Sequence, residues 1–104
     1  MNSMIPIKYR EFYDIPRMFV VSYHGNIYLF DCPFNEAKDD YQSHYDVYLM
    51  SGLTDKDLEG PWLSLISRGD SKVAEVPIKE VKFDETLRNG VDAEVLERLN
   101  RNNR

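Results

Sequence analysis

The fold class is decided by residues 17–32, which read RMFVVSYHGNIYLFDC, and by residues 45–50, which read YDVYLM. Both segments are rich in β-branched and aromatic side chains, which are typical of strands. Glycine accepts a positive φ and asparagine tolerates one, so we expect a tight turn at His24–Gly25 or Gly25–Asn26. The segments therefore predict an antiparallel meander of three strands.

Alternation along the run 18–23 predicts that this sheet is covered on both faces. Successive side chains of a strand point to opposite faces. The two sets are Phe19, Val21 and Tyr23, and Met18, Val20 and Ser22. Because both sets are largely apolar, each face of the strand needs a covering layer.

Three further runs read as short strands outside the meander. Residues 5–9 alternate apolar and polar side chains, and residues 73–78 and 80–84 follow a turn that is expected at 68–71. Trp62 lies in a dense apolar patch before that turn. We expect its ring to plug one end of the core.

Two helical segments complete the predicted fold. Residues 54–58 resemble a helical turn capped by Thr54, and Asp92 is a suitable N-cap for a C-terminal helix. The sequence thus predicts a mainly β (α+β) domain over residues 1–99. It is a small bent antiparallel sheet or partial SH3-like barrel of five to six strands, with a short helical turn and a C-terminal helix. Residues 100–104 are expected to form a frayed tail.

Charge and composition indicate which partners are unfavourable and which cellular compartment to expect. The 104 residues carry 18 acidic and 13 basic side chains, for a net charge of −5, and no run of Lys and Arg forms a basic patch. Such a surface repels phosphate backbones, so we expect no nucleic-acid partner. No signal-peptide pattern or membrane-spanning run is present, and one cysteine excludes an internal disulfide. We therefore expect a cytoplasmic protein without membrane association or cofactor.

A catalytic site is the first candidate for chemistry. Cys32 ends a predicted strand, His44 directly precedes the next predicted strand at 45–50, and Asp46 lies at its start. The three side chains could therefore form a nucleophilic site with an orienting carboxylate. The competing interpretation is that Cys32 is a small buried hydrophobic residue, as free cysteines usually are. No local nucleophile signature surrounds it, and we favour the buried interpretation.

A metal site in the acidic loop 35–46 is the second candidate. Asp39, Asp40 and His44 offer carboxylate and imidazole ligands for a divalent ion. Their spacing matches no known metal-binding signature, and carboxylates are common throughout this chain. A solvated loop that keeps the sheet edge soluble explains the same residues, and we favour that interpretation.

An aromatic binding surface is the third candidate and the favoured one. Tyrosine is enriched at interfaces because it combines an apolar body with a polar tip. Five tyrosines cluster on the meander: Tyr23, Tyr28, Tyr41, Tyr45 and Tyr48. We therefore expect a non-catalytic module that binds a protein partner or forms a homo-oligomer. The alternative is that residues 73–84 curl over the sheet and bury these side chains.

Overall fold

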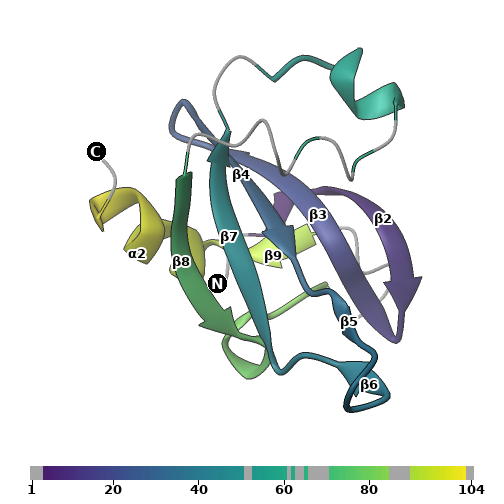
Figure 1. Cartoon of the computed structure of the whole chain (residues 1–104). Coiled ribbons are helices and arrows are strands. Elements are labelled where there is room, and N and C mark those ends of the chain that lie inside the picture. Colours follow the sequence, from purple (N-terminus) through teal and green to yellow (C-terminus); the bar gives the residue numbers. More distant parts are fainter. Residues whose placement is uncertain are drawn as a thin grey trace.

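The structure is a computed structural model that describes residues 4–50, 53–60, 62, 65, 71–84 and 90–102. It contains nine strands, two short 3₁₀ helices and one α-helix in this part of the chain (Figure 1). The strands are β1 (Met4–Pro6), β2 (Lys8–Tyr13), β3 (Ile15–Tyr23), β4 (Asn26–Asp31), β5 (Phe34–Asn35), β6 (Asp40–Tyr41), β7 (His44–Met50), β8 (Ser71–Pro77) and β9 (Gly90–Asp92). The helices are η1 (Asp57–Glu59), η2 (Ile78–Glu80) and α2 (Ala93–Asn102).

A five-stranded antiparallel sheet with the order β2-β3-β4-β7-β8 forms the centre of the molecule. Two further antiparallel pairs, β1-β9 and β5-β6, lie beside it. The sheet is not closed, because β2 and β8 are edge strands of the described sheet (Figure 1). This confirms the predicted mainly β fold with a small bent sheet, a short helical turn at η1 and a C-terminal helix.

The hairpin between β3 and β4 turns at His24–Gly25, one of the two predicted positions. Tyr23 pairs with Asn26, so two residues make the connection. His24 has a φ of 48° and Gly25 a φ of 83°. Positive φ at both central residues is the geometry that matches the right-handed twist of the flanking strands.

The main core lies between one face of the sheet and helix α2. Phe19 and Phe30 stack there with ring centroids 4.5 Å apart, and Tyr45 meets both rings edge to face. The helix contributes Val95, Leu96 and Leu99, all buried in the same cluster. The Asp92 carboxylate accepts a hydrogen bond from the Glu94 backbone N–H at 2.8 Å, as expected of an N-cap.

A second core covers the opposite face of the sheet. Met18, Val20, Leu29 and Met50 supply the sheet side, and Trp62 and Leu65 pack on them. Trp62 therefore lies over the second face, whereas the sequence analysis placed it at the end of a single core. Two contacts from β2 hold this layer: Lys8 Nζ pairs with Asp55 Oδ1 at 3.1 Å, and Arg10 donates to the Leu58 carbonyl at 2.9 Å. The prediction that both faces of β3 are covered is confirmed.

Several boundaries differ from the prediction. Residues 80–84 do not form a strand: after Pro77 the chain turns as η2, and only Phe83 makes an isolated bridge, to Val91. Burial alternates along this segment: Val81 and Phe83 pack on the main core, and Lys82 between them is exposed. The alternation therefore reflects packing on the core and not a ladder of paired strands. The region 66–70, where most of a turn was expected, lies outside the described residues. Helix α2 extends to Asn102, into the segment assigned to the tail.

Within the described residues, no helix has the length and apolar character that a membrane crossing requires.

Candidate functional site

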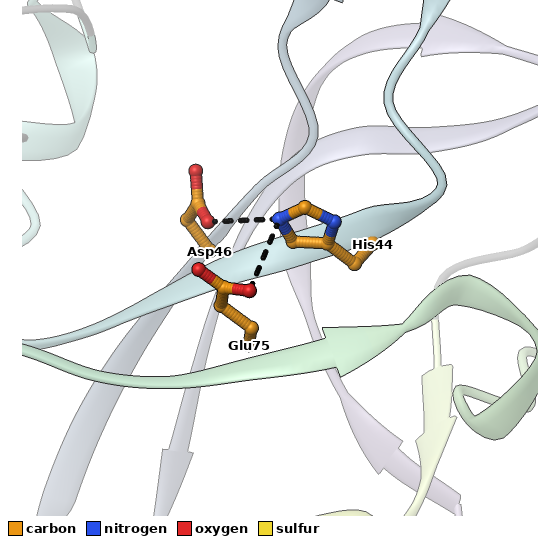
Figure 2. Close-up of side chains that lie close together, drawn as sticks. All are labelled: His44, Asp46 and Glu75. Atoms are coloured by element: carbon orange, nitrogen blue, oxygen red, sulfur yellow. Dashed lines mark ion pairs between the residues drawn. The ribbon is translucent and has the colours of Figure 1, made fainter.

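A cluster of polar side chains lies where β7 and β8 pair on the face of the second core. His44 and Asp46 are two residues apart on β7, so both point to that face. Asp46 pairs directly with Glu75 of β8. Figure 2 shows the imidazole of His44 directed toward both carboxylates. The backbone ladder therefore fixes the relative positions of these three residues.

The distances in this polar cluster are those of a compact ion-pair network. His44 Nε2 lies 3.3 Å from Asp46 Oδ1 and 3.6 Å from Glu75 Oε1 (Figure 2). Lys72 Nζ lies 2.9 Å from Asp46 Oδ1 and 2.6 Å from Glu75 Oε2. A bulge in β8 next to the Val47–Ala74 pair brings Lys72 opposite Tyr48 and into the cluster.

The charges of the polar cluster perturb one another in the expected directions. The hydrogen bond to Glu75, followed by the one to Asp46, raises the pKa of Lys72 above its ordinary value. The same hydrogen bond from Lys72 lowers the pKa of the Glu75 carboxyl. Both groups are therefore charged at neutral pH, and the pair remains ionised.

Asp31 adds a third carboxylate on the neighbouring strand. It pairs with Asp46 across β4 and β7, and the residue is only 9% exposed. Burial is the main cause that raises its pKa to about 6, and the charges of Asp46 and Glu11 add to the shift. The surroundings of Asp31 thus disfavour its ionised form.

Cys32 lies on the other face of the sheet, away from His44 and Asp46. It belongs to the main core with Tyr45 and is 1% exposed. Its thiol donates to the Gln42 carbonyl at 3.2 Å and accepts a hydrogen bond from the Arg17 guanidinium at 3.6 Å. Burial, outweighing the effect of Arg17, raises the pKa of the Cys32 thiol. The structure brings His44 and Asp46 together but separates Cys32 from them. Asp31 pairs with Asp46, and Cys32, the next residue after Asp31, points to the opposite face because successive residues of an extended chain alternate between faces.

Alkylation of Cys32 tests this placement. We expect iodoacetamide to label the folded protein much more slowly than the denatured protein at pH 7.5, because the thiol is buried and protonated. Intact mass spectrometry of a time course provides the measurement, and the single cysteine makes the result unambiguous. Equally fast labelling of folded and denatured protein would contradict the buried position.

The acidic loop does not assemble the metal ligands that were considered from the sequence. Asp39 and Asp40 are exposed on the β5-β6 hairpin, whereas His44 joins Asp46 and Glu75. Glu75 and Lys72 were not among the candidates expected from the sequence, because they come from β8, far along the chain. The β7-β8 register, which one sequence does not reveal, is the only signal that could have placed them.

The five tyrosines expected at a binding surface are divided between the core and the surface. Tyr28 and Tyr45 are fully buried, so they form part of the main core and are not accessible to a partner in this structure. The Tyr45 hydroxyl donates to the Pro16 carbonyl at 2.6 Å. The other three, Tyr23, Tyr41 and Tyr48, are partly exposed. The Tyr23 hydroxyl donates a hydrogen bond to the Glu97 carboxylate.

A different set of aromatic side chains is exposed beside edge strand β2. The most exposed are Phe12 (49%), Tyr13 (60%) and Phe34 (48%), and Tyr9 is exposed at 39%. Tyr41 lies between Tyr13 and Phe34, with ring centroids 5.7 and 5.3 Å away. We call Tyr9, Phe12, Tyr13, Phe34 and Tyr41 the aromatic surface. It joins the β2-β3 turn to the β5-β6 hairpin, which lie at the same end of the molecule (Figure 1).

Acidic side chains surround the hairpin end of the aromatic surface. Segments 11–14 and 34–41 contain five carboxylates and one lysine, Lys38, and all six side chains are exposed. The carboxylates are Glu11, Asp14, Glu36, Asp39 and Asp40. Arg17 stacks over the Tyr41 ring, with its guanidinium carbon 4.2 Å from the ring centroid. One aromatic ring of this surface thus already binds a cationic group.

No protein-family model matches the chain, and comparison with curated proteins and with solved structures gives no match either.

Proposed function

We propose that this protein is a non-catalytic interaction module that binds an extended, basic segment of another protein along β2 and the aromatic surface. The observation that carries the proposal is the exposure of edge strand β2. All six of its residues are exposed, and three of the five large exposed hydrophobic side chains in the described structure are on it. Monomeric proteins seldom leave such aromatic groups in water without a binding role.

The backbone of β2 supplies the means of binding. In the described sheet, β3 pairs with one side of β2 and no strand pairs with the other. A free edge offers a row of N–H and C=O groups to an incoming strand. Neighbouring aromatic rings then provide burial and selectivity, since aromatic anchors dominate the energetics of many interfaces.

The charge around the aromatic surface favours a basic partner over a second copy of this chain. The hairpin end carries five carboxylates against two cations, Lys38 and Arg17, so two copies would bring an excess of acidic side chains against each other. A partner segment with Lys or Arg is attracted instead, and its cations can stack on Tyr13 or Phe34 as Arg17 does on Tyr41. The proposal therefore commits to a basic segment in an extended conformation.

Two labelled octapeptides test the proposal: one alternates lysine and valine, and the other has glutamate in place of lysine. Fluorescence anisotropy should show that the basic peptide binds at least about tenfold more tightly than the acidic one, and less tightly as salt increases. Tyr13→Ala and Phe34→Ala should each weaken binding of the basic peptide by about tenfold, which is a typical loss for an aromatic anchor.

Met4→Ala provides the matched control, because Met4 is an exposed apolar side chain outside the aromatic surface. It should leave the affinity for the basic peptide unchanged. Equal affinity for both peptides, or equal losses from Met4→Ala and Tyr13→Ala, would overturn the proposal. The mass of the protein in solution gives a further test. If the wild type becomes a dimer as its concentration rises while Phe34→Ala stays a monomer, the surface binds a second copy and the proposal is overturned.

A further inference from the structure

The polar cluster on β7 and β8 has the spacing of a metal-ligand set. In a tetrahedral zinc site with bonds of about 2.0–2.1 Å, neighbouring ligand atoms lie about 3.3 Å apart. His44 Nε2 lies 3.3 Å from Asp46 Oδ1 and 3.6 Å from Glu75 Oε1, and all three atoms lie within 4.8 Å of one another. Only small side-chain adjustments are needed to place these atoms around one ion.

The ligand types and their support fit a transition-metal ion. One imidazole nitrogen with two carboxylates suits zinc and its neighbours better than calcium or magnesium, which prefer oxygen ligands alone. His44 and Asp46 share one strand, and Asp46 is paired with Glu75, so the ladder holds the three Cα positions. The Gln42 side-chain amide donates to Asp46 Oδ2 at 3.3 Å, which leaves Oδ1 facing the cluster.

Asp46 Oδ1 is the buried anionic atom of the set. It is inaccessible to solvent, and the ammonium of Lys72 lies 2.9 Å from it. The ammonium of Lys72 compensates its charge, and His44 Nε2 lies 3.3 Å from the same oxygen. A buried carboxylate oxygen needs a cation nearby, so a site for a cation exists here and Lys72 supplies one.

We propose that His44, Asp46 and Glu75 bind a divalent transition-metal ion such as Zn²⁺, and that Lys72 moves out of the cluster when the ion binds. Lys72 is 40% exposed at its side chain, so it can move into solvent. The ion replaces the ammonium as the counter-charge of Asp46 and Glu75. The three protein ligands leave a further position open to water or a ligand atom.

Cobalt(II) provides a spectroscopic test on untagged protein at pH 7.5. A four-coordinate cobalt site absorbs visible light far more strongly than the hydrated ion, and we expect such a band to appear on titration. Zn²⁺ should remove the band by displacement. His44→Ala should abolish it, and Glu75→Gln should weaken cobalt binding by at least about tenfold. Circular dichroism of each variant shows whether the fold is retained.

Lys72→Met makes the test specific to the proposal. Because Lys72 competes with the ion, its removal should tighten cobalt binding by about tenfold, whereas a purely structural ion-pair network gains no affinity for metal. His24→Ala is the matched control: His24 is the other histidine and pairs with an exposed carboxylate, Glu97, at 3.9 Å. Absence of the band in both wild type and Lys72→Met overturns the proposal. Equal loss of the band in His24→Ala and His44→Ala also overturns it.

Discussion

Replacing Trp62 with alanine is expected to lower the free energy of unfolding by about 3–5 kcal/mol, the usual range for loss of a large buried aromatic side chain. Trp62 is 6% exposed and packs in the second core with Met18, Leu29 and Met50. Its indole N–H donates to the Leu58 carbonyl at 2.8 Å, and the Arg10 guanidinium lies 5.3 Å from the ring centroid. One side chain therefore joins β2, the sheet and the segment around η1.

Urea denaturation measures this effect, followed by far-ultraviolet circular dichroism because the variant lacks the only tryptophan. Trp62→Phe is the matched control: it keeps much of the apolar contact but loses the hydrogen bond, so it should lose less stability than Trp62→Ala. Since small domains are stable by about 5–15 kcal/mol, Trp62→Ala should leave a marginally folded protein. A loss below about 1 kcal/mol would show that the second core does not support the fold.

Asp31→Asn is expected to stabilise the protein at pH 7, the opposite of most substitutions at buried positions. The folded protein raises the pKa of Asp31 to about 6, mainly by burial, with Asp46 and Glu11 as additional causes. A shift of two units corresponds to about 3 kcal/mol. Because water reaches part of the carboxyl, we expect a gain of about 1–2 kcal/mol in the free energy of unfolding. The amide has the same shape and carries no charge.

The pH dependence follows from the direction of the Asp31 shift. The unfolded chain loses the Asp31 proton near pH 4 and the folded protein near pH 6, so the folded state binds more protons between these values. The contribution of Asp31 to the free energy of unfolding therefore falls as pH rises from 4 to 6, and it stays at this lower value at pH 7. The gain from Asp31→Asn should be large at pH 7 and nearly absent at pH 4.

Thermal or urea denaturation of wild type and Asp31→Asn at a series of pH values, with a chelator present, measures this difference. Taking the difference between the two proteins removes contributions from groups such as Glu75, whose lowered pKa acts in the opposite direction. Glu36→Gln, at an exposed carboxylate, should show no such pH-dependent gain. A destabilised Asp31→Asn at pH 7 would mean that the ionised carboxylate makes favourable contacts.

The central strands could be predicted from the sequence because their signals are local. The apolar alternation in β3, the glycine turn and the aromatic runs in β4 and β7 each depend on residues a few positions apart. The predicted strand at 80–84 was wrong: Val81 and Phe83 show the alternating burial of a strand, but the segment meets β9 only through one isolated bridge, from Phe83 to Val91. The alternation of apolar and polar residues in a sequence indicates which side chains are buried, but it does not indicate whether the segment pairs with another strand.

The candidate sites were harder to predict because they depend on which strands become neighbours. His44 and Asp46 were identified as polar candidates, but Glu75 joined them only through the β7-β8 register. The tyrosines were chosen by residue type, and two of them, Tyr28 and Tyr45, proved to be core residues. Neither Tyr13 nor Phe34 was among the candidates chosen from the sequence, because no local signal indicates that their rings gather around Tyr41.

Binding of a basic extended segment by β2 and the aromatic surface can be mapped residue by residue from the amide chemical shifts of ¹⁵N-labelled protein during titration with the lysine–valine octapeptide. We expect the largest shifts at the amides of β2 and of the β5-β6 hairpin, with little change in β8 and α2. Shifts spread evenly over the molecule, or concentrated on β8 while β2 is unchanged, would contradict it.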